Sequence, residues 1–182
     1  IHAVDFFRVV AGEVRAVRTI SGPNVLGNYG FPDKACSHFS LDGGVAATLL
    51  TSHTLSAQTD SAEEWVDRGH EMRWIFTYSK GTLSVDLLRK TILVNRYEIY
   101  PAGTGGTRVV FDHVWNFPGS GDNFHHDIAA MRQDFIRRCS EGRAPLQDIQ
   151  DAWRTHLVCL AAEQSAVEDG RVIDLEYILP ND

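Results

Sequence analysis

Histidine is the side chain of this sequence best suited to acid–base chemistry, because imidazole ordinarily changes its charge near neutral pH. His2 precedes Asp5 by three positions, a spacing that places the two side chains on adjacent parts of one helical face. The carboxylate could then orient the imidazole to accept or donate a proton. The same spacing also suits an ordinary surface histidine beside an acid, so spacing alone leaves both interpretations open. The candidate set consists of His2, His38, His53, His70, His113, His125, His126 and His156.

His125 and His126 follow a glycine-rich stretch at the expected start of a helix, and such junctions often face a ligand cleft. Adjacent residues point in different directions, so both cannot serve one site. A metal site is not supported, since no HxxxH or HxxEH pattern accompanies the pair. The two histidines could contact a substrate, or they could be polar residues of a helix start with one side chain in solvent.

The remaining histidines have less specific surroundings. His53, His113 and Trp115 lie on expected strands and could line a sugar pocket, where a tryptophan would offer a flat apolar surface. Interior packing is the expected role of Trp115, whereas His38 and His70 are expected at the surface. His156 shares an apolar helix face with Ile149 and Leu160, which predicts a hydrogen-bonded core residue.

The three cysteines show no pattern of a disulfide framework or a zinc knuckle, because their number is odd and none has CxxC spacing. No histidine or basic cluster is expected to lie against a thiol, so we interpret all three as structural. A reducing cytoplasm fits this usage best. The residues concerned are Cys36, Cys139 and Cys159.

The order of apolar and turn residues predicts an α+β fold in one domain spanning residues 1–182. We expect an open, mostly antiparallel sheet of about six or seven strands with helices packed on one face. Asp42-Gly43-Gly44 is the clearest hairpin turn, because glycine supplies the positive φ that a tight turn demands. The candidate strand segments for this sheet are 14–21, 36–41, 45–53, 73–79, 82–88, 91–100, 107–115 and 172–179. Helices are expected at 1–11, 124–139 and from Pro145 to before Gly170.

The charge pattern restricts the partners. The formal net charge is −7, and lysines and arginines are scattered singly, which argues against nucleic acid or an anionic membrane as a partner. No apolar run approaches the roughly 18 residues of a membrane span, and no signal segment opens the chain, so a cytoplasmic protein is expected. Several strands are apolar with weak alternation, which is typical of sheets covered on both faces. A second copy could supply that cover, and we expect a homo-oligomer through the open sheet face.

The arrangement of motifs resembles the C-terminal domain of the Gfo/Idh/MocA oxidoreductases from end to end. The opening IHAVDFFRVVAGEV contains H-x-x-D-x-x-R at His2, Asp5 and Arg8. SLDGGVAATLLTS, KGTLSVD and a helix with DFIRR follow in order. The chain closes with GRAPLQDIQDAWRTHLVCLAAEQSAVEDGRVIDL. Each motif is loose by itself, and their order and separation are more specific.

The resemblance implies an NAD(P)-dependent oxidoreductase acting on a sugar, polyol or related hydroxy compound. In that family a Rossmann half binds NAD or NADP, and this half supplies the substrate pocket and the oligomer interface. His2 matches the family's catalytic acid–base histidine. Asp5 would either support the helix or contact the substrate, and His125 and His126 are further candidates for substrate contact. Gly103 to Gly106 lies between two expected strands and cannot present a helix N-terminus to a pyrophosphate, so we expect no cofactor site in this chain. We expect no metal site either.

Because residue 1 is Ile, we expect a fragment that lacks the Rossmann half and is inactive alone. The alternative is a non-enzymatic domain of the same fold that binds a ligand or dimerises. A third interpretation is a self-contained conical-sheet isomerase or hydrolase, which would need a closed pocket with an acid–base pair such as Asp112 and His113.

Overall fold

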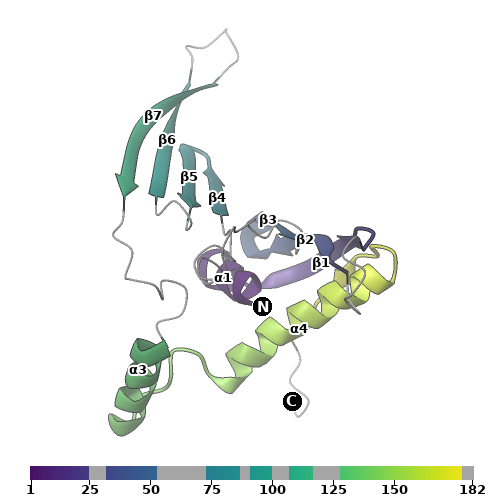
Figure 1. Ribbon diagram of the computed structural model, residues 1–182, viewed down its shortest axis with the longest axis vertical. Coiled ribbons are helices and arrows are strands. Elements are labelled where there is room, and N and C mark those ends of the chain that lie inside the picture. Colours follow the sequence, from purple (N-terminus) through teal and green to yellow (C-terminus); the bar gives the residue numbers. More distant parts are fainter. Residues whose placement is uncertain (25–31, 53–72, 87–90, 100–106, 117–127, 178–182) are drawn as a thin grey trace, which may run out of the picture. The chain divides into compact units, whose positions relative to one another are not determined.

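The computed structural model describes residues 1–24, 32–52, 73–86, 91–99, 107–116 and 128–177. These residues divide into two compact units, one of Ile1–Thr54 with Ala129–Asp182 and one of Leu55–Ile128. Each unit contains a four-stranded antiparallel sheet (Figure 1). No helix among the described residues is long and apolar enough to cross a membrane.

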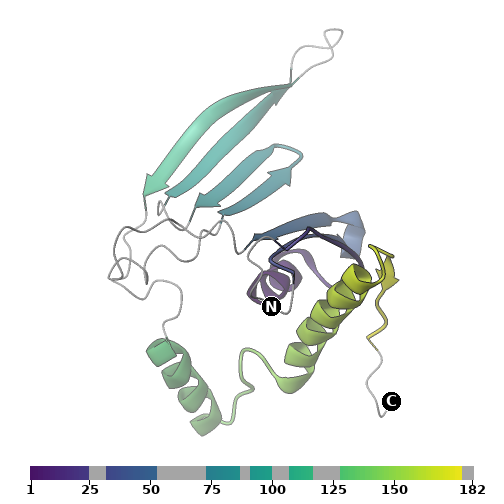
Figure 2. The same cartoon turned by 45° about the vertical axis from the view of Figure 1, so that its right-hand side comes forward.

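The first unit has a sheet with the order β3-β2-β1-β8, and two of its helices, α1 and α4, lie on one face of that sheet (Figure 2). Neighbouring strands are antiparallel throughout. The elements are α1 (His2–Ala11), β1 (Val14–Ser21), β2 (Lys34–Leu41), η1 (Asp42–Gly44), β3 (Ala46–Ser52), α3 (Ile128–Ser140), α4 (Ile149–Val167) and β8 (Ile173–Asp174).

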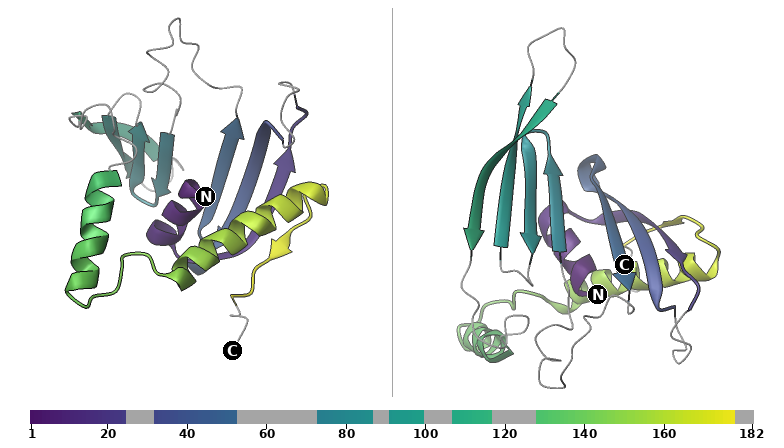
Figure 3. Two further views of the ribbon diagram at one scale, coloured as in Figure 1. Left: turned by 60° about the horizontal axis from the view of Figure 1, so that its bottom comes forward. Right: turned by 45° about the horizontal axis from the view of Figure 1, so that its top comes forward.

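Alternation along the strands builds the core of this unit. Side chains of β1 and β2 that point to one face are buried, whereas their neighbours along the strand are exposed. Phe7 of α1 packs against Phe39 of β2 with ring centroids 5.6 Å apart, and α4 covers β1 (Figure 3). The buried apolar cluster consists of Val4, Val14, Val17, Phe39, Leu41, Val158, Ala161 and Leu175.

The hairpin between β2 and β3 is confirmed, and its turn is a short 3-10 helix. Leu41 N donates to Val45 O at 2.8 Å and closes the turn. Gly43 and Gly44 have φ of 67° and 78°, which glycine adopts without the steric cost of a Cβ. The positive φ therefore falls on the two glycines of the Asp-Gly-Gly turn, and Asp42 stays outside that region.

The buried face of α4 differs from the predicted one. We expected the side with Ile149, His156 and Leu160, but Ile149 and Leu160 are 83% and 62% exposed, and His156 is exposed as well. The His156 ring bonds its own helix, with Nδ1 2.8 Å from Ala152 O. The buried face of α4 consists instead of the small residues Thr155, Val158, Ala161 and Ser165.

Ser165 shows why polar residues occupy that face. Its Oγ accepts a hydrogen bond from Thr19 N at 2.8 Å and donates to Arg171 O at 2.5 Å. Thr19 Oγ1 in turn donates to Ser37 Oγ at 2.8 Å. A buried polar group is tolerated where it is hydrogen-bonded, so these residues join α4 to the sheet instead of facing water.

The second unit is a meander of four strands with the order β4-β5-β6-β7. Cross-strand partners lie on the same face, and one face is apolar and rich in aromatic rings. Its rows run Trp74–Val85–Ile92–Trp115 and Phe76–Leu83–Val94–His113. The strands are β4 (Arg73–Tyr78), β5 (Gly81–Asp86), β6 (Thr91–Ile99) and β7 (Thr107–Asn116).

The α+β class and the antiparallel pairing are confirmed. The strands form two sheets of four in the described residues, whereas the sequence suggested one sheet of six or seven. Trp115 is 49% exposed on the edge strand β7, so its expected interior packing was wrong. Its ring lies edge-on to His113 with centroids 4.4 Å apart. β8 is shorter than predicted, because it pairs with β1 only at Ala16 and Val17.

Candidate functional site

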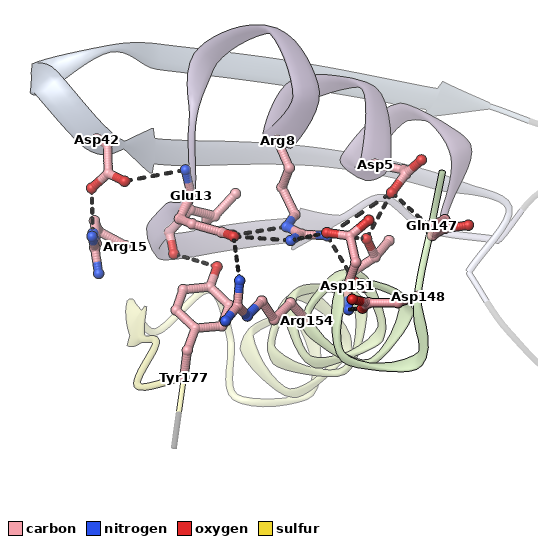
Figure 4. A network of polar contacts seen from close by, with 12 residues as sticks. Asp5, Arg8, Glu13, Arg15, Asp42, Gln147, Asp148, Asp151, Arg154 and Tyr177 are labelled. Atoms are coloured by element: carbon pink, nitrogen blue, oxygen red, sulfur yellow. Dashed lines mark hydrogen bonds and ion pairs between the residues drawn. The ribbon is translucent and has the colours of Figure 1, made fainter. Parts of the chain in front are cut away.

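A buried arginine on α1 organises the polar cluster that joins α1 to α4 (Figure 4). Arg8 follows Val4 on the inward side of α1, and its side chain is only 4% exposed. Gly12 ends the helix with a φ of 92°, and Glu13 follows directly. The turn at Gly12 therefore brings the Glu13 carboxylate back toward the guanidinium.

All three nitrogens of the planar Arg8 guanidinium donate hydrogen bonds. Nε and Nη2 donate to the two carboxylate oxygens of Glu13 at 2.8 and 2.9 Å. Nη2 also donates to Asp151 Oδ1 at 2.7 Å, and Nη1 donates to Asp151 O at 2.9 Å. Nη1 reaches Thr155 Oγ1 at 2.5 Å. This bidentate geometry is specific to arginine, because a lysine offers only a point charge.

Asp5 completes the connection between the two helices. Its Oδ1 accepts hydrogen bonds from Thr155 Oγ1 at 2.9 Å and from Gln147 Nε2 at 3.0 Å. Arg8 Nη1 lies 3.9 Å from the same oxygen. Two residues of the opening H-x-x-D-x-x-R motif thus attach α1 to the start of α4. Contact of Asp5 with a substrate stays a prediction.

The electrostatics follow from these contacts. Hydrogen bonding to Arg8 lowers the pKa of Glu13, and the charges of Arg8 and Arg154 lower it further against the opposing effect of burial. The hydrogen bonds to Glu13 likewise raise the pKa of Arg8. Burial raises the pKa of Tyr177 to about 12, and its hydroxyl donates to Val14 O at 2.6 Å. Arginine and glutamate therefore stay charged at neutral pH, and the tyrosine stays neutral.

His2 lies in the first turn of α1 and is exposed. Val9 follows seven positions later and therefore lies on the same side of the helix, where it is 76% exposed. Fixing α1 through Arg8 also fixes the position of the His2 backbone. The remaining site predictions, His125 and His126, lie outside the described residues, and so do His53 and His70.

The start of α4 is poorly suited to binding the pyrophosphate of a dinucleotide. Asp148 caps this helix by accepting a hydrogen bond from Asp151 N at 2.8 Å. Two carboxylates thus occupy the helix end that a pyrophosphate would need. Within the described ranges, no three His, Cys, Asp or Glu side chains gather so that they could hold a metal ion.

Sequence reasoning missed two features of the first unit. The role of Arg8 was not predicted, because Asp151 and Thr155 lie more than 140 positions along the chain. The contact between Cys36 and His38 contradicts the expectation that no histidine lies against a thiol. The spacing of two residues on a predicted strand would have revealed it, since such side chains share a face.

Solved structures with the same fold cover almost all of this chain. Levoglucosan dehydrogenase in complex with NADH and L-sorbose matches 97% of it at 16% identity and a TM-score of 0.69, over 48% of its own length. An oxidoreductase from Agrobacterium radiobacter in complex with NAD+, L-tartaric acid and magnesium matches 95% at 18% identity and a TM-score of 0.68, over 46% of its length. UDP-N-acetylglucosamine 3-dehydrogenase GnnA from Acidithiobacillus ferrooxidans matches 92% at 18% identity and a TM-score of 0.63, over 46% of its length.

These similarities confirm the fold that the sequence resemblance implied, that of the C-terminal domain of Gfo/Idh/MocA-type oxidoreductases. The chain spans about half the length of the solved structures it matches. No family model matches the sequence, and neither does any curated protein sequence.

Proposed function

We propose that this chain is the substrate-side part of an NAD(P)-dependent oxidoreductase acting on a sugar, polyol or related hydroxy compound. The observation that carries the proposal is the near-complete match of the chain to about half of a levoglucosan dehydrogenase that binds NADH and L-sorbose. A hydride acceptor is then held by a part of the enzyme other than these residues. NAD(P) supplies the hydride chemistry there.

His2 is the residue proposed to handle the substrate proton. When a carbinol carbon loses hydride, its hydroxyl must lose a proton, and a positioned base lowers that barrier. His2 is exposed at the start of α1 beside the exposed apolar surface of Val9. Such a surface suits contact with a nucleotide-binding part. Asp5 and Arg8 support this arrangement because they hold the helix that carries the histidine.

The apolar face of the β4–β7 sheet is the proposed oligomer interface. Between Arg73 and Asn116 the described residues contain no helix that could cover this face, and Trp115 and Tyr78 are 49% and 57% exposed. A sheet with one apolar face is stable when that face is buried against another layer. A second copy of the chain presents an equally apolar surface. Sedimentation equilibrium of the wild type and of a Trp115→Ser variant tests this interface. We expect the variant to self-associate more weakly than the wild type.

The decisive experiment compares the chain with the protein encoded by its complete reading frame. We expect the upstream sequence to contain a strand followed by G-x-G-x-x-G. We also expect the longer protein, but not residues 1–182, to reduce NAD(P) with a sugar or polyol as substrate. His2→Asn should lower kcat by at least about a hundredfold, the usual contribution of a general base, and leave NAD(P) binding intact. His156→Asn is the matched control, because His156 is exposed and bonds only its own helix in the described residues.

Two results would contradict the proposal. NAD(P)H production by purified residues 1–182 would show that the chain needs no separate nucleotide-binding part. A complete reading frame without any such part, together with no partner subunit that supplies one, would favour the non-enzymatic ligand-binding or dimerisation domain instead.

A further inference from the structure

Cys36, His38 and Thr48 form a line of three side chains on the face of the first sheet opposite to α1 and α4. Cys36 and His38 are two residues apart on β2, so they project from the same face. Cys36 Sγ lies 3.7 Å from His38 Nε2. On the other side of the ring, His38 Nδ1 lies 3.0 Å from Thr48 Oγ1, on the β3 residue directly opposite. Both ring nitrogens of His38 are therefore engaged.

This order of groups is the one in which an imidazole activates a thiol. The thiolate is the nucleophile, and a base within hydrogen-bond reach can remove the thiol proton. In neutral imidazole one nitrogen donates and the other accepts, and the partner of one nitrogen sets the role of the other. When Nδ1 donates to Thr48 Oγ1, Nε2 is free to accept the proton of Cys36. Thr48 is therefore placed to hold the ring in the useful tautomer.

The other cysteines provide a comparison within the same chain. Cys139 on α3 is exposed, whereas Cys36 and Cys159 are half-buried. Neither Cys139 nor Cys159 bonds to an imidazole in the part of the chain that the structure describes. If exposure decided reactivity, Cys139 would react first. If the imidazole decided it, Cys36 would.

We propose that Cys36 is a site of reversible S-thiolation by small disulfides, activated by His38 and oriented through Thr48. The Cys36 thiol passes its proton to His38 Nε2, and the thiolate attacks one sulfur of the disulfide. A bond forms between Cys36 Sγ and that sulfur while the S–S bond of the small disulfide breaks. The released thiolate takes the proton from the imidazolium, so one thiol is consumed and one is formed, with the small disulfide as the oxidant.

The surface around Cys36 suits a small polar disulfide. His38 and Ser40 are exposed on β2, and Thr48 is exposed on β3. Ile20 and Leu50 are the cross-strand partners of Cys36 and are 50% and 67% exposed, so the described strands leave the surface on both sides of the thiol open. An open approach matters because the thiolate must reach the attacked sulfur in line with the S–S bond that breaks.

The test treats purified residues 1–182 with glutathione disulfide near neutral pH and locates the adduct by peptide mass spectrometry. We expect the mixed disulfide at Cys36 to form faster than at Cys139, and reduced glutathione to remove it. His38→Gln should slow the reaction at Cys36 about tenfold, less than the hundredfold of an enclosed general base, because the site is open to water. The rate at Cys139 should not change.

Two further variants separate activation from a change of fold. Thr48→Val keeps the shape of the side chain and should give a Cys36 rate between those of the wild type and His38→Gln. His156→Gln removes an imidazole elsewhere and should leave the rate unchanged, and circular dichroism checks that each variant is folded. Faster modification of Cys139 in the wild type overturns the proposal. So does an unchanged Cys36 rate in folded His38→Gln, or the absence of any adduct at Cys36.

Discussion

Replacing Arg8 by methionine removes the guanidinium that joins α1 to α4 and keeps a long apolar side chain. Arg8 donates five hydrogen bonds to Glu13, Asp151 and Thr155. Its own side chain is 4% exposed, whereas those of Glu13 and Asp151 are 27% and 38% exposed. Removing one partner of a fully buried ion pair costs about 3–5 kcal/mol, and here the two carboxylates can regain water. We therefore expect the free energy of unfolding of the first unit to fall by about 2–3 kcal/mol.

Native-state hydrogen exchange measures this loss where it should occur. The amides of Val158, Ala161 and Ser165 lie on the buried face of α4, and their exchange should become roughly 30- to 150-fold faster. Arg137→Met on α3 is the control, because Arg137 is 53% exposed and exposed ion pairs contribute little. Unchanged exchange at the three α4 amides in Arg8→Met would refute the reasoning, since the network would then add no stability.

The same variant predicts a change in acid sensitivity. Contact with Arg8 lowers the pKa of Glu13 from its ordinary value of 4.5 in the folded state. The stabilisation that the charged Glu13 carboxylate gives the folded state is therefore complete above pH 4.5, and it is lost as the pH falls through the lower pKa of the folded protein. In Arg8→Met the folded pKa should return toward the ordinary one. Stability measured by urea unfolding should then fall less steeply with acid below pH 4.5 than in the wild type.

Three further substitutions test local contacts. Tyr177→Phe removes the hydrogen bond to Val14 O, and urea unfolding should show a loss of about 1 kcal/mol. Asp148→Ala removes the cap of α4, and the helix should lose about 1 kcal/mol, seen as faster exchange in its first turn, whereas Asp148→Asn should lose little. Gly81→Ala would place a Cβ 2.2 Å from Asn95 O, so the β5–β6 amides should lose about 1–3 kcal/mol of protection. Gly22→Ala, with its nearest atom at 3.4 Å, should cost far less.

Each of these has an outcome that contradicts it. Equal stability of Tyr177→Phe and the wild type would mean that Val14 O finds water in place of the hydroxyl. Equal losses in Asp148→Ala and Asp148→Asn would exclude capping as the cause. Equal protection in Gly81→Ala and Gly22→Ala would show that β5 and β6 do not approach as closely as the structure has them.

Local chemistry made several elements predictable. β1 occupies Val14–Ser21 as expected, because its β-branched residues favour a strand and Gly12 ends the preceding helix. The turn at Gly43 and Gly44 was predictable for the same kind of reason, since a positive φ is a property of the residue itself. The H-x-x-D-x-x-R motif likewise marked the helix that carries His2.

Long-range packing decided what local pattern could not. The apolar side of α4 with Ile149 and Leu160 was the natural choice from periodicity, and the structure buries Thr155 and Ser165 instead. A polar side chain belongs in a core only when a partner is present, and that partner, Thr19 N, comes from a distant strand.

By itself, the sequence determined the α+β class, the antiparallel strands, the hairpin and the family resemblance, because these depend on residue conformation and short-range order. Only the tertiary structure decided the partners of Arg8, the buried face of α4 and the division of the strands into two sheets. Those depend on which surfaces meet across the chain, and one set of local propensities is compatible with several such pairings. Cys36 and His38 lie between the two cases, since their shared face follows from strand geometry and the link to Thr48 from the register of β2 with β3.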